Sequence, residues 1–383
     1  MKKTYLLALL GTLSFALCAC EKVPGDVTYQ NVVCPSNIEI HTELQKGLLE
    51  TDNYMSYLLS HQNEICRYSN SAPIKTVITW KTETDNGAKA KNQTVELSKN
   101  QDFAEVMSFK AQNDSAEIYN LEINASYYGR IASKVKSKYF YSDTFTFVTE
   151  ESGPRNIFVE GVENFRDLGG FKLENDKIYK QGLIYRCAQL NYDKNDDSPL
   201  ESQPTTLGKD ILNKQLGIKT EIDLRKNGQG SFEDDETVGL KSSPAGSSVK
   251  YVQTPMNYGG KNIFTQDINK ESIQEFFNVL SKEESYPLMF HCVRGTDRTG
   301  ALAYVVGALC GASQEDLIND YLFSNFANIN QTSYLGTNSI DSLKSAIDKC
   351  EGEDFSSKTK SYLYSTCEIS EETCNKIIDI LTD

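Results

Sequence analysis

The sequence predicts a small antiparallel β unit followed by a larger α/β domain with a mostly parallel sheet flanked by helices. Two observations predict this fold class. Between residues 75 and 149 apolar positions recur with a period of two, whereas after residue 154 short apolar strands alternate with helical segments. The length of 383 residues also exceeds what one hydrophobic core usually organises. We therefore expect an N-terminal region at 36–152 and a second domain at 155–383.

Residues 1–19 have the pattern of an export signal. Two lysines precede an apolar run at 5–17 that is short for a membrane span. The run ends in Leu-Cys-Ala-Cys, which resembles the lipobox of bacterial lipoproteins, with Cys20 as the lipidated residue; ordinary signal cleavage is the alternative. Residues 20–35 are expected to form a tether. The sequence thus predicts an exported protein anchored by lipid to a bacterial membrane, in the periplasm or at the cell surface.

The N-terminal region combines helical and strand patterns. Apolar residues at helical intervals predict one or two helices between residues 44 and 66. Alternating or β-rich segments predict strands at 76–82, 93–97, 116–123, 127–132 and 144–149. Trp80 on an early strand, followed by Leu121 six residues before Tyr127, resembles a small fibronectin type III or immunoglobulin-like β-sandwich. Such a module serves as a spacer or a binding module, and we expect no catalytic site in it.

Strands and helices alternate in the second domain. Strands are predicted at 178–185, 217–224, 249–254 and 286–290, helices at 209–216, 272–281 and 299–309, and a polar loop at 229–248. The last strand and the last helix are joined by a tight loop, and this layout carries the functional interpretation.

Residues 292–298, Cys-Val-Arg-Gly-Thr-Asp-Arg, form that loop. A loop that runs from a strand into a helix points successive backbone N–H groups at one spot, where the helix dipole favours negative charge. Gly295 lets the loop wrap closely, and Arg298 supplies a planar fork for two phosphate oxygens. The expected phosphate-binding residues are Val293, Arg294, Gly295, Thr296, Asp297 and Arg298.

Cys292 at the start of the loop is the expected nucleophile. The field of the loop favours a thiolate, which can attack phosphorus in line and form a phosphocysteine. Thr299 can hydrogen-bond the sulfur, and His291 is expected to fix the loop because it lies on the buried strand. A chance Cys-x5-Arg spacing is the alternative, but the apolar strand, the histidine and the Thr-Gly helix start argue against it.

HCVRGTDRTG at 291–300 resembles the HCxxGKDRTG signature of a bacterial tyrosine phosphatase family that includes secreted mycobacterial and listerial enzymes. Further stretches resemble this family in the same order: NFRDLGG at 164–170, LIYRC at 183–187, IDLR at 222–225 and DYLFSN at 320–325. The resemblance covers about 155–383. It implies a cysteine-phosphatase fold, hydrolysis of phosphotyrosine-type monoesters through Cys292, and no cofactor.

The chain departs from the family pattern in the loop. The family lysine is Thr296 here, Arg294 adds a cation at another position, and Cys187 replaces a serine. These changes leave the preference for phosphorylated inositol head groups open. We expect four charged residues to brace the loop through ion pairs rather than to touch substrate: Arg166, Asp167, Arg186 and Asp223.

The leaving group needs a proton, normally from a carboxylic acid. Asp297 lies inside the loop, where the resemblance places an aspartate considered for this role. Asp267 lies before the helix at 272–281, about where related cysteine phosphatases carry a mobile acid loop; an ordinary surface carboxylate is the alternative for it. Asp297 is slightly favoured.

Composition excludes several other functions. A net charge of −14 argues against nucleic-acid binding through a basic face. Three histidines lie far apart and neither CxxC nor HExxH occurs, so we expect no metal site. Export makes disulfides plausible, and the expected pairs are Cys34 with Cys66 and Cys350 with either Cys367 or Cys374. Separately, Cys187 is a candidate partner for oxidation of Cys292.

Two alternatives to a phosphotyrosine phosphatase stay open. The first is a phosphoinositide or inositol phosphate phosphatase, which Arg294 favours and the acidic composition disfavours. The second is a phosphate-binding pseudoenzyme or a surface adhesin whose β-sandwich does the binding. The expected partners are therefore a phosphorylated protein or phosphoinositide and, through lipid on Cys20, the membrane; the sequence leaves the oligomeric state open.

Overall fold

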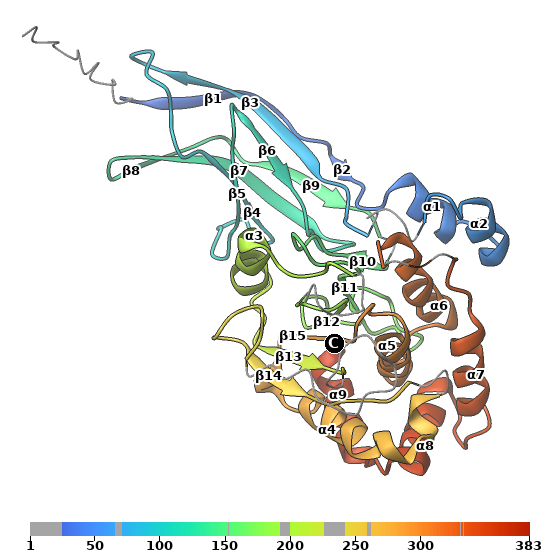
Figure 1. The fold of residues 1–383 in the computed structure, drawn as a ribbon. Coiled ribbons are helices and arrows are strands. Elements are labelled where there is room, and N and C mark those ends of the chain that lie inside the picture. The colour runs from blue at the N-terminus through green and yellow to red at the C-terminus, as the bar shows by residue number, and fades with distance from the viewer. Residues whose placement is uncertain are drawn as a thin grey trace, which may run out of the picture.

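The computed structural model describes residues 25–65, 71–151, 153–191, 200–225, 242–258, 262–329, 331 and 333–383. A β-rich unit and a mixed α/β unit lie at opposite ends of the molecule (Figure 1). The export signal and Cys20 lie outside the described residues. Within the described ranges, no helix has the length and apolar character needed to cross a membrane.

Two sheets form the N-terminal β unit. The first has the antiparallel order β1 (Val27–Val33), β3 (Thr76–Thr84), β6 (Ser115–Ile118). The second has the order β2 (Asn37–Ile38), β9 (Phe145–Thr149), β7 (Ser126–Val135), β4 (Thr94–Ser98), β5 (Met107–Lys110), with β8 (Lys138–Tyr141) on β7. Buried side chains of both sheets, among them Ile78, Trp80 and Ile131, share one hydrophobic core.

The strands of this unit differ from the prediction in three places. Residues 27–33, expected in the tether, form β1 because they pair with β3. The segment predicted at 116–123 ends as a strand at Ile118, and its continuation turns at Asn120, which has a φ of +61°. Strands β5 and β8 were not expected from the sequence, since they are edge strands with short apolar patterns.

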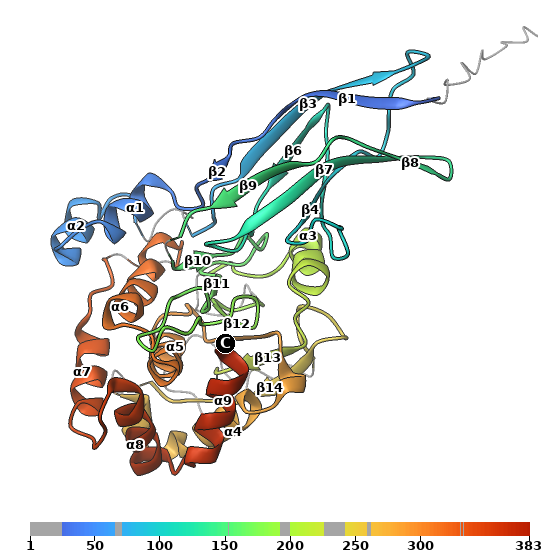
Figure 2. The same ribbon diagram turned by 180° about the vertical axis from the view of Figure 1, so that it is seen from behind.

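Where the sequence predicts one or two helices between residues 44 and 66, the structure has two, α1 (Glu43–Leu49) and α2 (Tyr54–Ser60). Thr42 begins α1 with a capping box, because its hydroxyl accepts from the backbone N–H of Gln45. The helices leave the β unit and place Leu48 and Leu58 in the core of the α/β unit. Both views show them beside α6 (Gln314–Leu322) (Figures 1 and 2). The expected N-terminal region at 36–152 therefore divides its packing between both units.

One mixed, mostly parallel sheet organises the α/β unit. Its order is β10 (Arg155–Asn156), β11 (Arg166–Asp167), β12 (Ile184–Cys187), β15 (Leu288–His291), β13 (Thr220–Asp223), β14 (Lys250–Gln253). The last four are mutually parallel, as predicted for this domain. Strand β12 begins later than residue 178, because Ile178 and Tyr179 form bridges with Lys172 and Thr382 instead.

The helices cover the sheet unequally. Leu288 and Phe290 of β15 face a large core shared with α4 (Lys270–Leu280) and α5 (Asp297–Cys310). Met289 faces a smaller core, which is covered by α3 (Thr206–Asp210) and a π-helical turn (Ile211–Gln215). The remaining helices complete the larger side: α6, α7 (Asn338–Ile347), α8 (Phe355–Cys367) and α9 (Glu371–Leu381). Short 3-10 turns lie at Ile263–Thr265, Asp267–Asn269, Glu283–Ser285 and Phe323–Phe326.

The cysteine pairs expected near the C-terminus are not formed. Cys350, Cys367 and Cys374 are free thiols. The Cys367 thiol instead points at the carbonyl of Phe264, at 3.7 Å, and Cys374 is buried on α9. Cys34 is also free, and its expected partner Cys66 lies outside the described residues.

Arg155 joins the two units. Its guanidinium donates to the carbonyls of Asn120 at 2.8 Å and Leu121 at 2.9 Å in the β unit, and to Asp167 Oδ2 at 2.5 Å in the α/β unit. Asp167 also accepts from the backbone N–H groups of Gly169 and Gly182. Asp167 therefore contacts residues at the junction between the units and not the loop that it was expected to brace.

Candidate active site

The loop at 292–296 turns its carbonyl groups outward. Four successive carbonyl oxygens of the loop each accept a hydrogen bond. The oxygen of Cys292 accepts from His291 Nδ1 (3.1 Å) and that of Val293 from the backbone N–H of Gln189 (2.9 Å). The oxygen of Arg294 accepts from Asn164 Nδ2 (2.9 Å) and that of Gly295 from Arg186 Nη2 (2.6 Å). By contrast, the backbone N–H groups of 293–298 have no hydrogen-bond acceptor among the described residues. This polarity produces a cradle of donors at the N-terminus of α5, which is suited to an anion.

Gly295 is required by the shape of the loop. Its φ is +70°, a conformation that side-chain-bearing residues rarely adopt. A Cβ at this position would also lie 2.3 Å from the carbonyl oxygen of Cys187, which is backbone and cannot give way. The loop therefore wraps against the end of β12 only with glycine here.

Three side chains at the loop have the arrangement expected for thiol chemistry on phosphate. Cys292 is buried where β15 ends. Arg298 is held through Nη1 alone, which donates to the carbonyls of Leu224 and Met256 at 3.2 Å each. Its Nε and Nη2 have no partner within the described ranges, so one edge of the guanidinium is available to an anion. The Thr299 hydroxyl is buried and likewise lacks a described partner, as expected for a group that hydrogen-bonds sulfur or phosphate.

One side of the loop rests on paired arginines, which we name the arginine flank: Asn164, Arg166, Arg186, Asp320 and Ser324. The Asp320 carboxylate accepts from Arg166 Nε at 3.0 Å and from Arg186 Nη1 at 2.5 Å. Arg166 also bonds Asn164 Oδ1, so both arginines reach loop carbonyls, one directly and one through an amide. Two guanidiniums against one carboxylate leave a net positive charge beneath the cradle, which favours anion binding.

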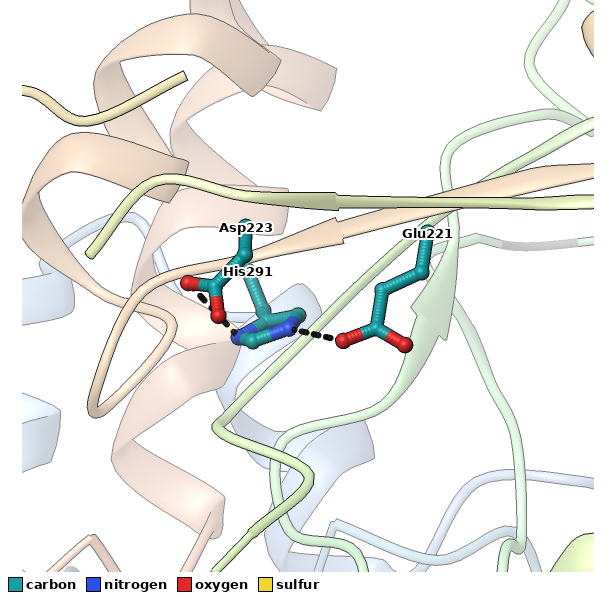
Figure 3. Close-up of side chains that lie close together, drawn as sticks. All are labelled: Glu221, Asp223 and His291. Atoms are coloured by element: carbon teal, nitrogen blue, oxygen red, sulfur yellow. Dashed lines mark hydrogen bonds and ion pairs between the residues drawn. The ribbon is translucent and has the colours of Figure 1, made fainter. Parts of the chain in front are cut away.

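The other side rests on buried acids, which we name the carboxylate flank: Glu221, Asp223, Arg225, Tyr251 and His291. Glu221 and Asp223 lie two residues apart on one face of β13, and both approach the His291 ring (Figure 3). Glu221 Oε1 is 3.0 Å from Nε2, and Asp223 Oδ1 is 3.9 Å from Nδ1. Burial alone would raise the pKa of Asp223, but the Arg225 guanidinium lowers it to about 2.

The three side chains of Figure 3 have ligand atoms close enough to surround a metal ion. Each carboxylate oxygen, however, already accepts a hydrogen bond. Glu221 is bonded by His291 and by the Ser243 hydroxyl, and Asp223 by Arg225 and Tyr251. A cation would have to displace these partners, of which only Tyr251 is not buried, so the donor set fits a structural brace better than a metal centre.

The two candidate acids lie in different surroundings. Asp297 is the first residue of α5, and its Oδ2 accepts from the Thr296 hydroxyl at 3.1 Å. Asp267 is exposed on a short 3-10 turn, and no described residue contacts its carboxylate. Arg294 is half-buried, and its side chain is unpaired within the described ranges. Of the two acids, Asp297 is the one fixed at the loop.

A large cavity lies away from this loop. It has a volume of about 1060 Å³ and is bordered by β5 and β6 on one side and by α3 and the π-helical turn on the other. None of the residues from 291 to 299 lines it. The chemistry-bearing side chains and this cavity are therefore separate features.

The sequence interpretation overlooked several residues that shape the site. Glu221, Arg225 and Asp320 each contact a residue singled out from sequence; Arg225 and Asp320 were only part of motifs, and Glu221 was only part of the predicted strand at 217–224. A signal was present, because charged residues on a strand of a sheet flanked by helices must be paired when buried. Which partner each would find depends on neighbouring strands, and no sequence spacing indicates that.

Several known proteins are similar to part of this chain. The model of the tyrosine phosphatase family matches residues 157–383. A protein of Cupriavidus necator, provisionally named a tyrosine-protein phosphatase, is 26% identical over 198 residues, covering 47% of this chain and 67% of that protein. One similar solved structure is the core catalytic domain of the PP-IP phosphatase SIW14 from S. cerevisiae in complex with citrate. It is 17% identical, the match covers 46% of this chain and 91% of the SIW14 domain, and the TM-score is 0.26. A second Siw14 catalytic core is 18% identical, with coverages of 50% and 95% and a TM-score of 0.27.

The family match extends over more than half of the chain and includes every strand of the α/β sheet except β10, the anion cradle and the helix behind it. On that ground, this chain belongs to the tyrosine phosphatase family.

Proposed function

We propose that this protein hydrolyses phosphate monoesters of the phosphotyrosine type through a phosphocysteine on Cys292. The observation that carries the proposal is the polarity of the loop. Four outward carbonyls, and the N–H groups of 293–298 that have no acceptor in the described part of the chain, form an anion cradle directly after the cysteine. Arg298 adds an unpaired guanidinium edge to the same cradle.

The proposed reaction has two steps. Sulfur of Cys292 attacks phosphorus while the bond to the leaving oxygen breaks, and Asp297 gives that oxygen a proton. Water then attacks the phosphocysteine, Asp297 takes a proton from the water, and the S–P bond breaks to release phosphate. Thr299 can hydrogen-bond the departing thiolate, because its buried hydroxyl has no described protein partner. The steps use no cofactor.

A second candidate substrate class is the phosphorylated inositols. Arg294 supports it, because this half-buried cation is unpaired in the described part of the chain and lies within the loop. A second phosphate on a ring could pair with it, whereas a phosphotyrosine peptide offers one phosphate. Rates on phosphotyrosine peptides and on inositol phosphates, measured for wild type and for Arg294→Ala, separate the two classes. A selective loss on inositol phosphates would favour the second.

We further propose that the β unit is a fibronectin type III-like module that presents the enzyme from a lipid anchor on Cys20. The Tyr127 hydroxyl accepts from the backbone N–H of Glu122 at 3.0 Å, the hydrogen bond of a tyrosine corner in immunoglobulin-like folds. Strand order within the two sheets is consistent with that assignment. Labelling of exported protein with palmitate, compared between wild type and Cys20→Ala, tests the anchor; equal labelling would refute it.

Cys292→Ser is the direct test of the enzymatic proposal. We expect it to abolish p-nitrophenyl phosphate hydrolysis and to retain binding of phosphate, because the N–H cradle is backbone. Cys310→Ser is the matched control, since this buried cysteine lies at the other end of α5. Turnover by Cys292→Ser at the wild-type rate would refute the mechanism, and a wild-type protein that binds phosphate without turnover would indicate a pseudoenzyme.

A further inference from the structure

Three segments come together at the end of the β unit that points away from the α/β unit, and we name this end the β tip: residues 25–26, 85–93 and 134–140. Strand pairing places them there, because Val27 lies opposite Thr84 and Ala132 lies opposite Thr94. Both views show the β7–β8 hairpin and the start of β1 reaching out at this end (Figures 1 and 2). The described chain therefore begins at the β tip.

The β tip is locally basic in an acidic chain. The whole chain has a net charge of −14, whereas the tip has five lysines, Lys89, Lys91, Lys134, Lys136 and Lys138, against two acids, Asp26 and Asp85. Lys138 is paired with Asp26 at 2.7 Å. Lys134 and Lys136 are exposed and have no acidic partner within the described ranges. The tip thus presents uncompensated positive charge, which attracts an anionic surface.

One face of the β7–β8 hairpin carries aromatic rings beside these cations. Tyr139 and Tyr141 lie two residues apart on β8, stack with ring centroids 6.1 Å apart, and are 51% and 46% exposed. Lys134 lies opposite Tyr139 in the strand register, and its ammonium is 5.0 Å from the centroid of that ring. Exposed tyrosines among lysines suit the boundary between lipid head groups and water, where a ring meets apolar and polar surroundings at once.

The chain itself brings the β tip close to a bilayer. Asp26 is held at the tip by Lys138, and the backbone N–H of Gly25 donates to Asp85 Oδ1 at 3.2 Å. From Cys20, the proposed lipid anchor, to Asp26 the chain can span at most about 20 Å. A lipid on Cys20 therefore keeps the tip within about that distance of the head groups, close enough for its lysines to reach them.

We propose that the β tip docks on the anionic phospholipid surface of the membrane that holds Cys20. Its lysines contact lipid phosphates, and its exposed tyrosine rings lie among the head groups. This inference rests on the proposed lipid anchor and not on the chemistry of the loop. Strand β7 runs for 10 residues, about 33 Å, between the junction side of the β unit and the tip, so docking holds the α/β unit away from the bilayer.

Vesicle sedimentation of the full chain with Cys20→Ala measures the contribution of the tip without the lipid. Vesicles of equal parts phosphatidylglycerol and phosphatidylcholine are compared with vesicles of phosphatidylcholine alone. We expect binding to the first kind only, and weaker binding as the salt concentration rises. Adding Lys134→Gln and Lys136→Gln should weaken binding about twentyfold, since each lysine near an anionic surface contributes about fivefold.

The matched control is Lys177→Gln with Lys349→Gln. Both lysines are exposed on the α/β unit and have no acidic partner in the described part of the chain, so the pair removes the same charge from the other end of the molecule. We expect its vesicle binding to stay within about twofold of the parent, because charges far from the surface are screened. All variants should keep the wild-type Tm and the wild-type rate on p-nitrophenyl phosphate, because these lysines lie outside the candidate active site.

A second measurement uses the lipid-anchored wild type in the same two kinds of vesicle. Trypsin cleaves after exposed lysines, and an exposed hairpin end is a preferred site of cleavage. Docking should slow cleavage after Lys134 and Lys136 about tenfold on the anionic vesicles relative to phosphatidylcholine. Cleavage after Lys177 should be equal on both.

Two results would overturn the inference. The first is equal vesicle binding by the Lys134→Gln, Lys136→Gln variant and the control pair, which would mean that only total charge matters. The second is equal cleavage after Lys136 on both kinds of vesicle, which would mean that the hairpin stays in water. Absence of palmitate on wild type would instead refute the proposed anchor, and absence of p-nitrophenyl phosphate hydrolysis would refute the proposed enzyme.

Discussion

The arginine flank and the carboxylate flank hold opposite sides of the same loop by different means. Arg186 and Asn164 of the arginine flank bond loop carbonyls directly, at 2.6 and 2.9 Å. The carboxylate flank reaches the loop through His291, whose ring bonds Glu221 on one side and the carbonyl of Cys292 on the other. The first flank therefore sets the direction of the N–H groups, whereas the second mainly holds the ends of β13 and β15 together.

This difference separates catalytic from structural consequences. A change in the arginine flank should alter both stability and phosphate binding, because it moves the donors of the cradle. A change in the carboxylate flank should alter stability with little effect on phosphate binding. The two flanks also differ in charge. The arginine flank is positive overall, whereas the carboxylate flank contains two acids.

The largest effect is expected from Asp320→Asn. This change leaves two fully buried guanidiniums without their carboxylate, and removal of one partner from a buried ion pair typically costs about 3–5 kcal/mol. Urea unfolding should show this loss, together with weaker vanadate binding. Glu315→Gln is the matched control on the exposed side of the same helix, where about 0.5 kcal/mol or less is expected. Equal losses in the two variants would contradict the assigned role of Asp320.

The next effect is acid sensitivity of the carboxylate flank. The pKa of Asp223 is lowered from 3.8 to about 2, so the folded state binds its proton less readily than the unfolded state. Its stabilisation is fully present above pH 4 and is lost as the pH falls from about 4 to about 2, on the order of 2 kcal/mol. The difference in unfolding free energy between wild type and Asp223→Asn, followed from pH 6 to pH 3, should shrink. A constant difference would argue against this linkage.

Arg186→Lys should separate the two functions of the arginine flank. Lysine keeps a charge for Asp320 but lacks the fork that also reaches the Gly295 carbonyl. We expect about a tenfold loss of vanadate affinity and of kcat. Arg155→Lys at the junction is the control, since it should lower Tm and leave vanadate affinity unchanged. Similar vanadate affinities of Arg186→Lys and Arg155→Lys would contradict a role of the arginine flank in phosphate binding.

The smallest effect is expected from Glu221→Gln. The amide keeps an oxygen for His291 but loses the charge and the second oxygen, which accepts from the Ser243 hydroxyl, so we expect about 1 kcal/mol of destabilisation. Vanadate affinity should stay within about twofold of wild type. A loss of activity comparable to that of Arg186→Lys would show that the carboxylate flank controls the cradle as closely as the arginine flank does.

Local patterns predicted much of this protein. The strand, loop and helix around 292–298 were predicted to within about two residues at each end, because apolar strand, glycine turn and apolar helix are each encoded locally. One or two helices were likewise predicted between residues 44 and 66, where the structure has two and Thr42 caps the first. Edge strands β5 and β8 were missed, since short segments with one exposed face have weak patterns.

The chain's own sequence determined which residues could hold a phosphate: a cysteine, a positive-φ glycine and an arginine at fixed spacing in one loop. Those properties follow from backbone sterics and local dipoles. Tertiary structure alone decided what holds that loop, because Arg186, Asp320 and Glu221 come from segments far apart in the chain. It also placed α1 and α2 on the α/β core. Such pairings arise when buried charges and apolar faces find partners on packing, and no spacing along the chain encodes them.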